Sequence, residues 1–363
     1  MLDRRELLRF FAAAACTAGL PELTMAKADT DARLVLVILR GAADGLAMAA
    51  PYGDSRYARL RGELALAKPG NEGGLLKLDG TFGLHPSFKQ VHALFEAREA
   101  TLLHAIATPY RERSHFDGQD MLEDGSSSGD SLRDGWMNRA LQPLGGAVGN
   151  ERAIALSQNT PLVLRGTNSV TSWAPSRLPD ADADTLARIE SLYADDEFFA
   201  TRLTQALQSQ AIAGDMASTR RRGNDAEQLK ASLESAARFL ANDDGLRVAV
   251  VESGGWDTHA NQGAANGNLA NRFAALDEAL AGLRTGLATH WANTAVLVVT
   301  EFGRTARVNG TRGTDHGTAS AALLLGGAVS GGKIVADWPG LADRNLYDGR
   351  DLFPTTDMRS LFK

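Results

Sequence analysis

Cysteine is almost absent from this chain of 363 residues, because the single Cys16 lies close to the N-terminus. One thiol cannot form a disulfide within the chain. If the N-terminal segment is removed, the remaining protein has no thiol to act as a nucleophile or as a metal ligand. Any reactive centre must then be built from histidine, carboxylate and hydroxyl side chains.

Concentrated positive charge and long apolar runs are also missing. The net charge is −6, and the one basic cluster is Arg220–Arg222 in the polar stretch "STRRRGNDAEQ". Binding to a phosphate backbone needs a concentrated basic surface, so we expect no nucleic-acid partner. A bilayer-spanning helix needs roughly 20 apolar residues, so we expect no integral membrane segment in the mature chain.

The N-terminal segment has the pattern of an export signal. Arg4 and Arg5 precede a short apolar run from Phe10 to Leu20, and Ala26-Lys27-Ala28 offers a cleavage site before Asp29. This pattern is typical of a twin-arginine signal peptide. We therefore predict a signal over residues 1–28, recognition by the twin-arginine export machinery, and a periplasmic or secreted mature protein.

The mature chain, residues 29–363, alternates short apolar runs with helical patterns. Continuous apolar runs of this length are typical of strands buried on both faces of a parallel sheet. The sequence therefore predicts an α/β/α sandwich with a mostly parallel central sheet. A region without strand patterns, about residues 180–244, predicts a helical insertion. The expected strands are Leu34–Leu39, Thr101–Ala107, Arg152–Leu156, Arg247–Val251, Ala295–Thr300 and Ser320–Gly327.

Polar clusters follow several of the predicted strands. In open α/β sheets, ligands bind outside the carboxyl ends of the strands, so these clusters predict a shared site. A further cluster comes directly before the last apolar run. The clusters read "RGAADG", "TPYRERSHFDGQD", "ESGGWDTHANQ", "EFGRTAR" and, before the last run, "GTDHGTAS".

Asp257 and His259 are the strongest candidates for metal ligands. Their i, i+2 spacing turns both side chains to one side of an extended loop. His316 and Asp315 add another imidazole and carboxylate in a later loop. A mixed set of this kind favours Zn²⁺ or Mn²⁺ over Mg²⁺ or Ca²⁺. We predict a divalent metal held by Asp257, His259 and His316, with Glu301 or Asp315 as a further ligand.

Ser114 has two interpretations. It stands before His115 at the start of a predicted helix, where backbone N–H groups and the helix dipole favour a phosphate or sulfate. There its hydroxyl could act as a nucleophile beside His115. The alternative is an ordinary N-cap serine, whose side chain only completes the first turn of the helix.

The motifs together resemble an exported bacterial family known as domain of unknown function 1501. They include "VLVILRGAADGL", "FGLHPSF", "TPYRERSHFDGQDMLEDG", "SGGWDTHANQ" and "TEFGRTARVNGTRGTDHGTASAALLLGG". That family is grouped with the alkaline phosphatase-like superfamily, which includes sulfatases and phosphoglycerate mutases. The resemblance implies an alkaline phosphatase-like sandwich, two metal sites and a nucleophile at a helix N-terminus. It places the nucleophile in the loop of Ser114 and His115.

Two positions depart from the superfamily pattern. Arg40 ends the first strand, where a metal-binding aspartate is usual, and Glu301-Phe302 replaces an Asp-His pair. We therefore expect one metal, with three arginines of the strand-end loops, Arg40, Arg113 and Arg304, supplying the positive charge of the second. The alternative is that these arginines form structural salt bridges. The function implied is hydrolysis of small anionic esters of phosphate or sulfate; the alternative is an inactive protein that binds metal or anions.

Overall fold

The computed structural model describes residues 30–127, 132–144, 151–174, 183–213, 224–242 and 245–362. The predicted signal peptide, Cys16 and the cluster Arg220–Arg222 lie outside the described residues. Within the described ranges, no helix combines the length and the hydropathy that crossing a membrane requires.

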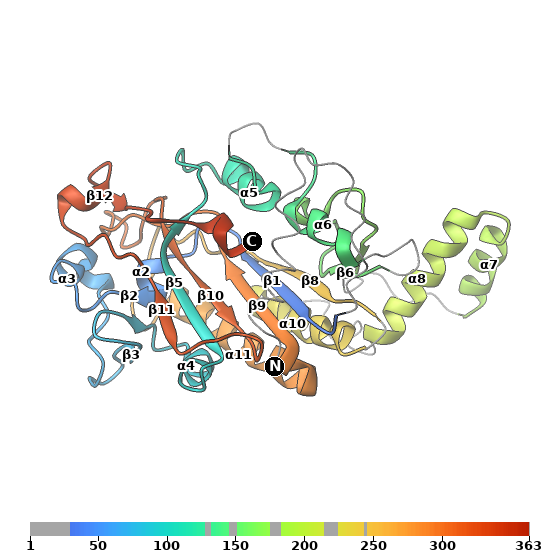
Figure 1. The fold of residues 1–363 in the computed structure, drawn as a ribbon, viewed down its shortest axis with the longest axis horizontal. Helices are drawn as coiled ribbons and strands as arrows, with labels where there is room; N and C mark the ends of the chain where they lie inside the picture. Colours follow the sequence, from blue (N-terminus) through green and yellow to red (C-terminus); the bar gives the residue numbers. More distant parts are fainter. Residues whose placement is uncertain are drawn as a thin grey trace.

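A sheet of nine strands forms the centre of the molecule (Figure 1). The strands follow the order β11-β5-β10-β9-β1-β8-β6-β7, and β14 pairs with β5. All pairings are parallel except those of β10, which runs antiparallel to β5 and β9. The predicted α/β class and mostly parallel sheet are therefore confirmed. The strands are β1 (Arg33–Leu39), β5 (Ala100–Ala107), β6 (Ala153–Ala155), β7 (Thr171–Ser172), β8 (Val248–Ser253), β9 (Thr294–Val299), β10 (Ser320–Leu325), β11 (Lys333–Val335) and β14 (Thr356–Asp357).

Both faces of the sheet are buried, which explains the unbroken apolar runs. In β1, Val35 and Val37 belong to one core cluster, while Leu36 and Ile38 belong to another. The first cluster includes side chains of α4, α10 and α11, and the second includes side chains of α5, α6 and η6. Helices therefore cover the sheet on both sides, as a sandwich requires. These helices are α4 (Lys89–Glu96), α5 (His115–Asp124), α6 (Trp136–Ala140), α10 (Asp225–Leu240), α11 (Asn268–Leu287) and η6 (Met358–Phe362).

Shorter elements complete the molecule around the strand ends. Two small antiparallel sheets lie apart from the central one, in the orders β2-β4-β3 and β12-β13. They comprise β2 (Ala49–Ala50), β3 (Leu76–Lys77), β4 (Gly83–Leu84), β12 (Leu346–Tyr347) and β13 (Asp351–Leu352). The short helices are α2 (Gly45–Met48), α3 (Tyr57–Arg61), η1 (Gly62–Leu64), η2 (Gln142–Leu144), η3 (Leu162–Leu164), η4 (Ala288–Asn293) and η5 (Asp343–Asn345).

The region expected as a helical insertion contains helices in two different settings. In Figure 1, α7 (Ala183–Tyr193) and α8 (Glu197–Ala213) project from the molecule beyond β6. The following helix, α10, packs against α11 and buries Leu233 and Phe239 in the core. The described part of this region therefore contains both a projecting helix pair and one helix of the sandwich layer.

The reversed direction of β10 determines where the functional loops meet. The carboxyl ends of β1, β5, β8 and β9 lie at one edge of the sheet, because these strands run the same way. β10 runs the other way, so its first residue, Ser320, starts at that same edge. A residue that precedes β10 can therefore meet residues that follow the other strands.

Two buried histidines make the stability of the fold depend on pH. His85 is 1% exposed and His104 is fully buried. In each ring Nδ1 accepts a backbone N–H, so Nε2 carries the hydrogen and donates to the carbonyl of Ala264 or Ala49. Burial lowers the pKa of both imidazoles to about 4.

We expect the free energy of unfolding to fall as the pH drops from about 6.5, the ordinary histidine pKa, towards 4. In this window the unfolded chain takes up protons that the folded chain does not. Replacing His104 with asparagine should remove its share of this slope, about 3 kcal/mol at most. Urea unfolding across the window measures the slope, and Ile106→Val in the same strand is the matched control. An equal slope in wild type and His104→Asn would contradict the prediction.

Candidate metal centre

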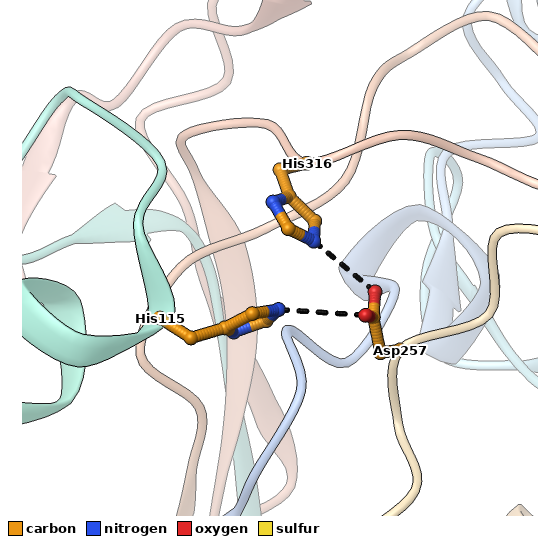
Figure 2. A group of neighbouring side chains, drawn as sticks. All are labelled: His115, Asp257 and His316. Atoms are coloured by element: carbon orange, nitrogen blue, oxygen red, sulfur yellow. Dashed lines mark hydrogen bonds and ion pairs between the residues drawn. The ribbon is translucent and has the colours of Figure 1, made fainter.

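Three side chains from separate segments of the chain lie close together (Figure 2). His115 begins α5, Asp257 follows β8, and His316 precedes β10. One ligand atom from each of these residues lies within 4.8 Å of the others. These three segments thus bring two imidazoles and one carboxylate within the reach of a single ion.

Hydrogen bonding fixes the orientation of the His115 ring. Its Nδ1 lies 2.8 Å from Oε1 of the buried Glu301. Burial opposes ionisation of Glu301, but hydrogen bonds from His115, Gly41 and Thr300 lower the pKa of this carboxyl overall. The carboxylate accepts, so Nδ1 carries the hydrogen and Nε2 has a free lone pair. Nε2 is buried, 3.6 Å from Asp257, without a hydrogen-bond partner among the described residues.

His316 and His259 are held in the same way. Nδ1 of His316 lies 3.0 Å from the carbonyl oxygen of Arg113, and Nδ1 of His259 lies 3.3 Å from Oδ1 of Asp315. Both partners accept, so both Nδ1 atoms carry hydrogen and both Nε2 atoms have lone pairs. These Nε2 atoms are only 3.0 Å apart, and two lone pairs at this distance repel. A proton or a metal ion between them removes the repulsion.

Asp257 lies where the three rings converge. Its carboxylate is 2.9 Å from Nε2 of His259 and 3.2 Å from Nε2 of His316. The Arg304 guanidinium donates to it at 2.5 Å. Burial opposes ionisation, but Arg304 and the neighbouring histidines lower the pKa of Asp257 overall. The aspartate is therefore held as an anion and is oriented toward the imidazoles.

Gly41 is required where the first loop passes beneath Asp257. Its φ of +116° belongs to a region that other residues rarely adopt, and a β-carbon there would lie 2.6 Å from the Asp257 nitrogen. The Gly41 N–H donates to Glu301 at 2.8 Å. A side chain at this position would push apart the loops that carry Asp257 and Glu301.

Comparison with known proteins assigns the chain to a family. Residues 31–363 match the model of a family described as Protein of unknown function (DUF1501). The chain belongs to the DUF1501 family. No curated protein matches it.

Two solved structures are similar to this DUF1501 chain at low sequence identity. One is the phosphonate monoester hydrolase of Agrobacterium radiobacter, with 13% identity and a TM-score of 0.39, over 86% of this chain and 73% of that chain. Another is the C-terminal periplasmic domain of EcEptC from Escherichia coli in complex with Zn, with 12% identity and a TM-score of 0.39. That match covers 85% of this chain and 77% of the EcEptC chain.

The predicted metal ligands of the DUF1501 chain lie together, but only some of them face the point where the Nε2 atoms converge. Asp257, His259 and His316 are in mutual contact. Glu301 and Asp315 contact the Nδ1 atoms of His115 and His259 instead. Glu301 and Asp315 are therefore positioned to orient the imidazole rings by hydrogen bonding to Nδ1, the nitrogen that points away from Asp257.

The residues predicted to be catalytic lie in different surroundings. Nε2 of His115 faces Asp257, while Ser114 is the N-cap residue of α5 without a capping bond from its side chain. The Ser114 N–H donates to the Tyr110 hydroxyl at 3.0 Å. Arg304 is fully buried, and Arg40 forms ion pairs with Glu123 and Glu252. Both arginines therefore form ion pairs, Arg304 with Asp257 and Arg40 with the two glutamates.

Sequence reasoning missed Gln262, which is fully buried and contacts residues of the loops that carry Asp257 and His316. Its Oε1 accepts hydrogen bonds from the hydroxyls of Thr258 and Thr314, at 2.9 and 2.8 Å. Its Nε2 donates to Asp44 at 2.7 Å, and Asp44 pairs with Arg61. This single amide therefore joins the loop of Asp257 to the loop of His316.

Gln262→Leu is expected to weaken metal binding about tenfold, the usual effect of losing a group that orients ligands. The two threonine hydroxyls lose their common acceptor, so the loops are no longer fixed against each other. Competition with a chromophoric chelator measures the affinity. Leu280→Ala on α11 provides a control for general loss of stability. If both variants lose affinity equally, Gln262 has no specific positioning role.

Proposed function

We propose that this chain binds one divalent transition metal and hydrolyses phosphate or sulfate esters with it. His115, Asp257 and His316 would hold the ion, with His259 beside them. One observation carries this proposal: the Nε2 atoms of three histidines converge on one carboxylate while each Nδ1 is held by an acceptor.

The residues fit such an ion in three respects. The buried Nε2 of His115 has no hydrogen-bond partner in the described part of the chain, as expected of an atom awaiting a ligand partner. Two imidazoles and one carboxylate form a donor set that suits Zn²⁺ or Mn²⁺. Acceptors behind metal-binding histidines, such as Glu301, also raise the basicity of the ligands.

Ester hydrolysis agrees with the surroundings of the centre and with the superfamily that the motifs resemble. A bound divalent metal polarises an ester oxyanion and lowers the pKa of water. α5 begins at His115, so the positive end of its dipole and its first backbone N–H groups lie beside the centre and favour an anion. Arg304 is buried behind Asp257, where its charge keeps the carboxylate ionised.

Metal analysis and hydrolysis assays test the proposal together. We expect the purified protein to carry about one Zn²⁺ or Mn²⁺ per chain. It should hydrolyse para-nitrophenyl phosphate or para-nitrophenyl sulfate, lose this activity with a chelator and recover it when metal is restored. Bound metal without hydrolysis of either ester would favour the alternative, an inactive metal- or anion-binding protein. A metal content near zero after reconstitution would refute metal-dependent hydrolysis and leave only anion binding.

We further propose that the protein is exported to the periplasm through the twin-arginine machinery, as the N-terminal pattern indicates. Changing Arg4 and Arg5 together to lysine keeps the charge but removes the arginine pair. We expect the variant to stay in the cytoplasm, as measured by cell fractionation and immunoblotting. Arg56→Lys, at an exposed position of the mature chain, is the control. Full export of the double variant would exclude this route.

A further inference from the structure

A cleft of about 510 Å³ lies between the end of β8 and the C-terminal half of α5. Arg40 lies at the end of β1, Glu252 comes from β8 and Glu123 from α5. Glu123 is buried, whereas Arg133 and Arg165 are exposed. The cleft therefore has charged groups at an inner, buried level, which includes Glu123, and at an outer, exposed level formed by Arg133 and Arg165.

At the inner depth, Arg40 is paired but retains a hydrogen-bond donor. Its Nε donates to Glu252 at 2.8 Å, and its Nη2 contacts Glu123 at 2.7 Å as well as Glu252. The other terminal nitrogen, Nη1, is buried and has no hydrogen-bond partner among the described residues. A buried donor without a partner is costly, so a small shift of the Arg40 side chain toward an acceptor on a ligand would stabilise it.

At the outer depth, two guanidinium groups are available to a ligand. Nε of Arg165 donates to the carbonyl of Thr160 at 2.9 Å, and this bond orients the side chain. Arg133 has no hydrogen-bond or ion-pair partner in the described ranges of the chain. Three carboxyl groups, Asp120, Glu123 and Glu252, line the same cleft and equal its three arginines in number. A singly charged oxyanion suits this balance better than a doubly charged one.

Helix α5 connects the cleft with the metal centre. His115 lies at its start, and Gln119, one turn later, donates to Glu301 at 3.2 Å. Glu123 follows after another turn, so it lies about 12 Å along the helix from His115. Arg40 is also next to Gly41, which donates to Glu301. One elongated molecule could therefore contact both places.

We infer that this cleft binds a second, singly charged oxyanion of the substrate, a carboxylate, a sulfate ester or a phosphodiester, while the metal centre holds the ester to be cleaved. Arg133 and Arg165 bind the anion with paired N–H donors, and Arg40 donates from within. The inference rests on the proposed function and narrows its substrate class. The preferred substrates are long esters with an anionic group at each end.

Direct binding tests the cleft independently of catalysis. The probe is para-trifluoromethylbenzoate, observed by fluorine NMR with chelator-treated protein. We expect the double variant Arg133→Ala/Arg165→Ala to bind it about tenfold more weakly, the usual effect of losing charged hydrogen bonds. Arg59→Ala, an exposed arginine on α3, should bind as wild type does. His316→Ala should also bind normally, because it alters only the metal centre.

Hydrolysis provides the second measurement. We expect the phosphate ester of omega-hydroxyoctanoate to have a lower KM than octyl phosphate, and the double variant to lose this difference with kcat unchanged. Benzoate binding that weakens in the double variant, without hydrolysis of either ester, would support anion binding in the cleft and refute the proposed function. Hydrolysis of both esters with equal KM values, and benzoate binding unchanged in the double variant, would refute anion binding in the cleft. The proposed hydrolase function would still stand.

Discussion

Asp257→Asn is expected to yield a folded protein that has lost its metal. Asparagine has the same shape and can still accept the hydrogen bond from Arg304, so the loop keeps its main contact. The negative charge toward which three imidazoles converge is gone, however, and a neutral amide is a poor ligand for Zn²⁺ or Mn²⁺. We expect the metal content to fall from about one ion per chain to less than about one-tenth, and hydrolysis to fall at least about a hundredfold.

Elemental analysis and ester hydrolysis measure these two losses. Asp343→Asn is the matched control, because Asp343 is exposed and pairs only with Arg307 among the described residues. The control should keep both metal and activity. A metal content in Asp257→Asn equal to that of wild type would show that Asp257 is not a ligand.

Arg304→Met is expected to lower the free energy of unfolding by roughly 3 kcal/mol or more, because several buried acceptors lose their donor at once. The guanidinium is fully buried and donates to backbone carbonyls from three separate segments. Those acceptors are the carbonyls of Gly41, Ala42, Trp256 and Thr314. Arg304→Lys should be almost as damaging, since one ammonium group cannot reach the positions that a planar guanidinium spans.

Urea unfolding of metal-free protein measures this effect apart from metal binding. Arg307→Met is the control, three residues along the same loop and half exposed, and it should change stability by only about 0.5 kcal/mol. If Arg304→Lys were as stable as wild type, the carbonyl contacts would contribute little, and Arg304 would act mainly through its charge on Asp257.

The strands could be predicted because their burial on two faces is visible in the sequence. Runs such as "LVLVIL" and "AVLVVT" have no polar position at which a solvent-facing side could begin, and both became central strands. The direction of β10 could not be predicted. An apolar run reads the same in either direction, yet it is the reversal of β10 that brings His316, which precedes its strand, to Asp257, which follows another.

The loops of the candidate metal centre could be predicted from polar clusters next to strands, but the role of each side chain could not. His115 was expected beside a nucleophile, because the sequence does not reveal how the first turn of α5 is rotated relative to the sheet. Glu301 and Asp315 carry the right chemistry, yet small differences in loop path place them behind the imidazoles. The surroundings of Arg40 and Arg304 depend on packing between segments far apart in the chain.

The contacts of Arg304 also constrain how the loops of this protein can change in length. The Arg304 guanidinium donates at the same time to carbonyls in the loop after β1, in the loop after β8 and in the segment before β10. These hydrogen bonds fix the distances between the three segments. An insertion or deletion in any of them would move its carbonyl away from a fixed donor, and neighbouring loops could not compensate separately. Length variation should therefore gather in segments outside this contact, such as the α7–α8 pair, and the three loops would have to be transplanted together into another scaffold.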